Sequence, residues 1–116
     1  MFVVNRSVAI IKPKHAFVDW VNSVSDEEPQ FSIYDLNLEH HVILLPEYDS
    51  KEHAEAILKK LYKKIFKVEL SAWITDESKW PKNKTYEEFL EWFDIQLYSM
   101  VFDPFENKIE KEPYED

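Results

Sequence analysis

The stretch VVNRSVAIIKP, residues 3–13, predicts the first element of the fold, a β-strand. Its residues from Val3 to Ile11 are rich in β-branched side chains, which favour strands. Pro13 cannot donate a hydrogen bond to a neighbouring strand, so we expect the strand to end near Lys12. A proline also suits the first turn of a helix, and the apolar spacing after His15 predicts a helix there.

Farther along the chain, apolar periodicity and capping residues predict the remaining elements. These are a turn capped by Ser32, a strand at His41–Leu45, a long helix from Asp49 or Ser50 to about Leu70, a helix after Thr85, and a strand at Ile95–Phe102. The expected order is therefore β-α-β-α-α-β.

That order predicts an α+β fold, a two-layer sandwich in which helices cover one face of a small mixed sheet of about three strands. A right-handed crossover through the first helix would make the first two strands parallel. The strand at Ile95–Phe102 is apolar on both faces, so we expect it at the centre of the sheet. Residues 1–105 are expected to form one domain, and 106–116 an acidic tail that frays.

The chain contains no glycine. Phosphate-binding loops, dinucleotide-binding turns and nucleophile elbows all need glycine where the backbone turns sharply or touches a ligand. The same argument excludes an EF-hand. Turns must be made by Asn, Asp, Ser and Pro, which favours connections of four or more residues over two-residue hairpins.

The chain also lacks cysteine, which excludes disulfides and thiolate zinc sites. Its apolar runs are too short to span a membrane, and the first residues do not have the pattern of a signal peptide. We therefore expect a cytoplasmic protein. The net charge of −9 argues against binding to nucleic acid and leaves a basic protein as the favoured partner.

Charge is unevenly distributed along the sequence. Residues 15–50 contain eight acidic residues and neither Lys nor Arg. We predict that residues 15–50 form one acidic surface that contacts a basic partner together with the acidic tail, and that Asp26, Glu27 and Glu28 are an exposed loop of this surface. A helix face with Lys59 through Lys67 is either solvated or a docking surface for acidic groups.

Arg6 is the only arginine and lies within the first predicted strand. Its planar guanidinium can hold a carboxylate or phosphate through two hydrogen bonds. One interpretation is an internal ion pair with Asp103 or Glu47. The other is an anion site, which could belong to a small enzyme that combines Arg6 with Asp76 and Asp103.

The loop Thr75–Pro81 places a tryptophan among charged residues. In one interpretation Trp80 fills the core while Asp76 or Ser78 caps a turn. In the other, Asp76, Glu77 and Trp80 belong to a recognition surface, because tryptophan is common at the centre of interfaces.

His40, His41 and His53 include ligand types that metals use, but their spacing does not favour a metal site. Neighbouring strand residues point to opposite faces, so His40 and His41 cannot share one site within a strand. We predict no metal and no cofactor.

Several short motifs spread over nearly the whole chain resemble those of a family of small uncharacterised bacterial proteins. The motifs are Asn5-Arg-Ser, Lys12-Pro-Lys, Leu45-Pro-Glu, Trp73-x-Thr-Asp-Glu-x-x-Trp-Pro81, Phe89-x-x-Trp-Phe93 and Ser99-x-Val-x-Asp103. The resemblance implies a single cytoplasmic bacterial domain without an assigned activity or ligand. The family has acidic and histidine residues in its last strand where this chain has Gln96 and Tyr98, which weakens any site there.

Two functions remain open at this point. The favoured one is a non-catalytic binding module whose acidic surface contacts a basic protein, as an inhibitor or immunity-type protein would. The alternative is a small enzyme built around Arg6, Asp76 and Asp103. Convergence of these three residues in a concave pocket would favour the enzyme.

Overall fold

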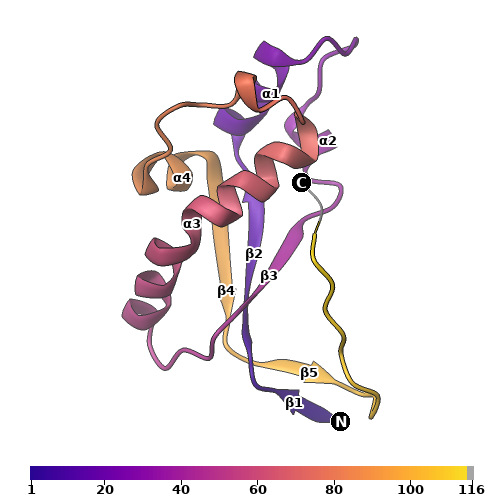
Figure 1. The fold of residues 1–116 in the computed structure, drawn as a ribbon, viewed down its shortest axis with the longest axis vertical. Coiled ribbons are helices and arrows are strands. Elements are labelled where there is room, and N and C mark those ends of the chain that lie inside the picture. The colour runs from indigo at the N-terminus through magenta and orange to yellow at the C-terminus, as the bar shows by residue number, and fades with distance from the viewer. Residues whose placement is uncertain (115–116) are drawn as a thin grey trace.

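The computed structural model describes residues 1–114 and shows a mixed α/β fold with two small antiparallel sheets (Figure 1). Glu115 and Asp116, the end of the predicted acidic tail, lie outside the described residues. The larger sheet has the strand order β3-β2-β4, and the smaller pairs β1 with β5. The strands are β1 (Phe2–Val4), β2 (Ser7–Pro13), β3 (His41–Leu45), β4 (Phe93–Tyr98) and β5 (Val101–Asp103).

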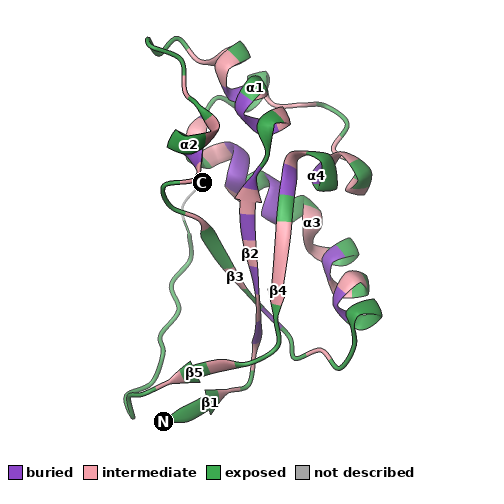
Figure 2. Ribbon diagram, turned by 180° about the vertical axis from the view of Figure 1, so that it is seen from behind, coloured by how far each residue is buried: buried purple, intermediate pink, exposed green. Residues whose placement is uncertain are grey.

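The helices of residues 1–114 are α1 (His15–Val24), α2 (Ile33–Leu36), α3 (Lys51–Trp73), the 3-10 helix η1 (Glu77–Lys79) and α4 (Tyr86–Trp92). Side chains cap each of these helices except α1. Ser32, Ser50 and Thr85 each accept a hydrogen bond from a backbone N–H in the first turn of α2, α3 and α4. The long helix α3 crosses one face of the three-stranded sheet, in front of it in Figure 1 and behind it in Figure 2.

The expected strand arrangement needs three corrections. The first predicted strand is divided at Asn5–Arg6 into β1 and β2, and the last at Ser99–Met100 into β4 and β5, so the order β-α-β-α-α-β is not observed. The pair β2–β3 is antiparallel, because two helices, α1 and α2, return the chain in the opposite direction. The central strand is β2, while β4 is an edge strand.

The apolar outer face of the sheet explains the wrong choice of central strand. Val42, Leu44 and Tyr98 lie on this face and are all exposed. A strand of this sheet can therefore carry apolar side chains on both faces although only one face is covered by helices. The sheet is buried only on the side where α3 lies, which is where Ala9, Ile11 and Leu45 point.

Aromatic rings fill the space between α3, α4 and the sheet. Phe66 is completely buried, and its ring centroid lies 5.8 Å from that of Phe89, 5.4 Å from that of Trp92 and 5.5 Å from that of Phe93. Because α4 passes directly into β4 at Phe93, these contacts fix the helix and the edge strand to α3 together.

The backbone accommodates the absence of glycine without unusual conformations. Within residues 1–114, no residue has a positive φ. The two-residue links Asn5–Arg6 and Ser99–Met100 join strands of different sheets and are not hairpins. Each antiparallel pair in the described chain is instead joined through a long connection that contains helices.

Residues 104–114 contain no helix or strand and are exposed. Their path leads from β5 back toward the side of the molecule that carries α2 (Figures 1 and 2). Across the described residues, none of the helices has both the length and the apolar composition that crossing a membrane requires.

Candidate functional site

Two acidic segments that are far apart in the sequence lie at the same end of the molecule, where α1 and α3 terminate (Figure 1). Asp26, Glu27 and Glu28 follow α1, and Asp76 and Glu77 follow α3; all five are exposed. The Lys79 side chain donates a hydrogen bond to the Val24 carbonyl at 3.3 Å, which joins η1 to the end of α1. We call these five acidic residues the acidic end.

The other acidic residues of the 15–50 run do not all belong to this surface. Asp35 accepts the backbone N–H of Ser32 in the capping box of α2. Glu47 and Asp49 lie in the loop between β3 and α3, at the opposite end of the molecule (Figure 1). Asp49 is hydrogen-bonded to His53 at 3.1 Å. The expectation of one acidic surface over all of residues 15–50 is therefore wrong.

Trp80 fixes the loop after α3. Its indole N–H donates to the Ile74 carbonyl at 2.8 Å, and its ring packs against the core. Asp76 caps η1 and accepts hydrogen bonds from the Ser78 hydroxyl at 2.6 Å and the Ser78 N–H at 3.0 Å. The Ser78 hydroxyl is the main reason that the pKa of Asp76 is lowered. These contacts match the interpretation in which Trp80 packs into the core and Asp76 caps a turn.

The structure does not bring Arg6, Asp76 and Asp103 together. Arg6 and Asp103 are at the end of the molecule with β1 and β5, and Asp76 is at the other end (Figure 1). Asp103 pairs with Phe2, which lies four residues before Arg6, and the chain bends at Asn5 between them. The Arg6 guanidinium donates to the Asn5 carbonyl at 2.8 Å, and Asp103 accepts the Phe105 N–H. The expected pair Arg6–Asp103 is not formed.

The three histidines considered as metal ligands have three different partners. His40 is hydrogen-bonded to Asn37 at 2.8 Å, His53 to Asp49, and His41 to Glu69 at 2.9 Å. Within residues 1–114, no three His, Asp or Glu side chains are grouped so that they could hold a metal ion.

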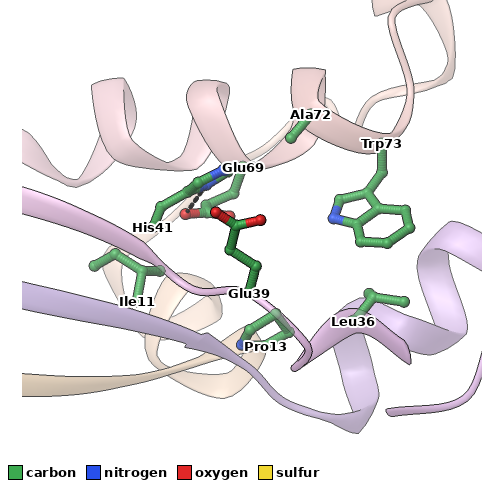
Figure 3. Close-up of a pocket in the computed structure, with 8 residues that line it drawn as sticks. All are labelled: Ile11, Pro13, Leu36, Glu39, His41, Glu69, Ala72 and Trp73. Atoms are coloured by element: carbon green, nitrogen blue, oxygen red, sulfur yellow. Dashed lines mark hydrogen bonds and ion pairs between the residues drawn. The ribbon is translucent and has the colours of Figure 1, made fainter. Parts of the chain in front are cut away.

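The His41–Glu69 pair belongs to a cavity of about 200 Å³ between α3 and the start of β3. The cavity is lined by Ile11, Pro13, Leu36, Glu39, His41, Glu69, Ala72 and Trp73. Figure 3 shows the carboxylates of Glu39 and Glu69 directed into it from the loop before β3 and from α3, with Trp73 at one side. The cavity therefore combines two carboxylates with an apolar wall.

Glu69 is only 3% exposed, although it is a charged residue type that is almost never buried without a partner. It lies on the inner side of α3, four residues after Ile65 and four before Trp73. Burial raises the pKa of its carboxyl, and the charge and hydrogen bond of His41 oppose that increase only in part. Glu69 is thus held in a site that disfavours its charge.

Sequence reasoning missed Glu69 and the role of Glu39. The signal was present, because Ile65, Glu69 and Trp73 form one row at four-residue spacing on the apolar side of the long helix. An acidic residue in such a row indicates either a buried partner or a ligand. His41 could be recognised as that partner only from the tertiary structure, since 28 residues separate it from Glu69.

The acidic end and the cavity are neighbours. The ring of Phe31, just after the Asp26–Glu28 loop, lies 5.2 Å from the ring of Trp73 at the side of the cavity. Asn22 holds Phe31 in place through hydrogen bonds to its backbone N–H and carbonyl. A molecule bound at the acidic end can therefore reach the cavity next to it.

No family model, no curated protein and no solved structure matches this chain. The resemblance to a family of small bacterial proteins consequently stays a prediction.

Proposed function

We propose that the protein is a non-catalytic binding module that contacts a basic protein partner through the acidic end. The observation that carries this proposal is the hydrogen bond from Lys79 to the Val24 carbonyl, which places the exposed Asp26–Glu28 loop and the exposed Asp76–Glu77 segment at the same end of the molecule. Carboxylates concentrated in this way attract a positively charged partner and accelerate its association. The net charge of −9 favours a basic protein over a nucleic acid as the partner.

The proposal treats the molecule as a two-layer α+β sandwich that presents the acidic end to a partner in the cytoplasm. The competing enzyme hypothesis receives no support, because Arg6 lies at the opposite end of the molecule from Asp76. Buried carboxylates can serve acid–base chemistry. However, Glu69 has no hydroxyl or thiol nucleophile among the residues that line its cavity.

The test starts with the immobilised protein, which captures its partner from a native bacterial lysate for identification by mass spectrometry. Association rates are then measured at several salt concentrations for the unmodified protein and for the combined variant Asp26→Asn, Glu27→Gln and Glu28→Gln. We expect a basic partner whose association at low salt is slowed about tenfold by the variant, with a weaker dependence on salt.

The matched control neutralises three exposed acids on α4 and β4, Glu87→Gln, Glu91→Gln and Asp94→Asn. This control changes the net charge by the same amount but leaves the acidic end intact. If both triple variants slow association equally, the association rate depends on net charge and not on the acidic end, which contradicts the proposal. A partner that binds the Asp26–Glu28 variant at the unmodified rate in low salt contradicts the proposal.

A further inference from the structure

The cavity beside the acidic end contains a carboxylate with unused hydrogen-bonding capacity. Within residues 1–114, the hydrogen bond formed by Glu69 is the one between its Oε1 and His41. A carboxylate can accept about four hydrogen bonds. No polar side-chain atom of the described residues is fully buried without a partner, so the second oxygen of Glu69 is open to the cavity that it lines. A ligand with N–H donors can satisfy it.

The walls of the cavity fit a side chain that has an apolar stem and a cationic head. Glu39 and Glu69 supply negative charge from two sides, and Leu36, Ala72 and Trp73 supply apolar surface (Figure 3). Long basic side chains pack their methylene groups against apolar surface and keep the charged head among polar groups. A volume of about 200 Å³ is sufficient for such a head and part of its stem.

Guanidinium fits the two carboxylates better than ammonium does. It presents five N–H donors in a fixed plane, so it can reach acceptors on two walls at once. It is also more weakly hydrated than an ammonium ion and loses less when it enters a site that is partly closed to water. A lysine head is a compact point charge that retains its water more strongly.

We propose that the cavity between Glu39, Glu69 and Trp73 binds an arginine side chain of the basic partner. The guanidinium is hydrogen-bonded to the carboxylates of Glu39 and Glu69, and the methylene groups lie against Trp73 and Leu36. His41 positions Glu69 by holding its Oε1. This proposal rests on the proposed function for the source of the arginine, while the acidic end guides the partner toward the cavity.

The site can be tested without the partner. N-acetyl-arginine methylamide is titrated into ¹⁵N-labelled protein, and N-acetyl-lysine methylamide serves as the matched probe. We expect saturable chemical-shift changes at the Trp73 indole N–H and at the backbone amides of Glu39, His41 and Glu69. The arginine compound should bind in the millimolar range, several-fold tighter than the lysine compound.

The variants Glu39→Gln and Glu69→Gln each retain side-chain shape but remove one charge from the cavity. Each should weaken binding of the arginine compound at least about tenfold, because hydrogen bonds to charged groups contribute more than neutral ones. Glu47→Gln, an exposed acid of the loop after β3, should leave the affinity unchanged. Equal binding of both compounds, or shifts that do not saturate at these residues, would overturn the proposal.

The two proposals can fail separately. If the arginine compound binds as expected but the lysate partner does not need Asp26, Glu27 and Glu28, the cavity site stands and the acidic-end function is wrong. If the partner needs the acidic end but binds the Glu39→Gln and Glu69→Gln variants normally, the function stands and the cavity site is wrong.

Discussion

The charged side chains on the two sides of α3 differ in their exposure to water. The outer side carries Lys59, Lys60, Lys63, Lys64 and Lys67, all of which are exposed. The inner side carries Glu69, buried among core residues and paired with His41. Water stabilises each lysine in the folded and the unfolded chain almost equally, whereas Glu69 loses most of its water on folding. One inner acid therefore affects stability more than any of the outer lysines.

The lysine side also contributes to an open groove. Lys63 and Lys67 line it together with Lys82 and Lys84 from the loop before α4. Lys59 lies with its Nζ 5.8 Å from the centre of the Tyr86 ring. The Lys84 ammonium donates a hydrogen bond to the Pro81 carbonyl at 3.4 Å, so the lysines around this groove also make local contacts.

The largest difference in the effect of a substitution on the free energy of unfolding is expected between Phe66 and Lys64. These residues lie two positions apart on different sides of α3. Phe66→Ala removes a completely buried ring from a cluster of aromatic residues and should lower the free energy of unfolding by about 3–5 kcal/mol. Lys64→Ala should change it by less than about 0.5 kcal/mol. Urea unfolding followed by tryptophan fluorescence measures both, and comparable losses would contradict the comparison of the two sides.

A change at Glu69 should alter how stability depends on pH. Because burial raises the pKa of Glu69 in the folded chain, the folded state binds this proton more tightly than the unfolded state. The contribution of Glu69 to the free energy of unfolding is therefore largest below its ordinary pKa of 4.5. It is lost as the pH rises through the raised pKa of the folded chain. Glu69→Gln has no proton to lose, so we expect it to be more stable than the unmodified protein at neutral pH.

Urea midpoints measured from pH 4 upward should show this gain growing with pH. Glu91→Gln, which neutralises an exposed acid of α4, serves as the control and should show no such growth. A Glu69→Gln variant that is less stable than the unmodified protein at neutral pH would mean that the ion pair with His41 outweighs the cost of burial. Loss of arginine binding together with a gain in stability would mark Glu69 as a binding residue rather than a structural one.

Substitution of Arg6 is expected to have the smallest effect on the free energy of unfolding. Its guanidinium contacts the neighbouring Asn5 carbonyl and is not paired with Asp103. Arg6→Lys and Arg6→Ala should each change the free energy of unfolding by less than about 0.5 kcal/mol. Thermal unfolding is sufficient as the measurement. A loss of several kcal/mol would restore the idea of a buried partner and place Arg6 with Glu69 among the energetically important charges.

Local signals predicted the helices well, because capping and apolar spacing depend on neighbours in the chain. Ser32, Ser50 and Thr85 cap helices where the sequence indicated. Strand pairing was predicted poorly, since it depends on which segments meet after the chain has turned. The direction of β3 follows from the path of α1 and α2, and β2 is central because β4 pairs with its other edge after α4, neither of which periodicity reveals.

The candidate site likewise has one part that local sequence signals predicted and one part that they did not. The acidic residues at 26–28 and 76–77 were recognised from composition, and the structure places the two segments at the same end of the molecule, where Lys79 contacts the Val24 carbonyl. The cavity was not predicted, because Glu39, His41 and Glu69 come from different elements and each one alone looks like an ordinary polar residue. An acid within the apolar row of a helix is the one local sign that could have drawn attention to it.

The absence of tight hairpins has a consequence for the order of events during synthesis. The central strand β2 is among the first segments to leave the ribosome, while β4, its partner on one side, ends only at Tyr98. At about 5–20 residues per second, translation delays β4 by several seconds. Until then β2 keeps an apolar edge without its native neighbour, a state that promotes aggregation. A nascent chain that stops before Phe93 cannot complete the sheet, so β2 pairs with β4 only after the intervening residues have been synthesised.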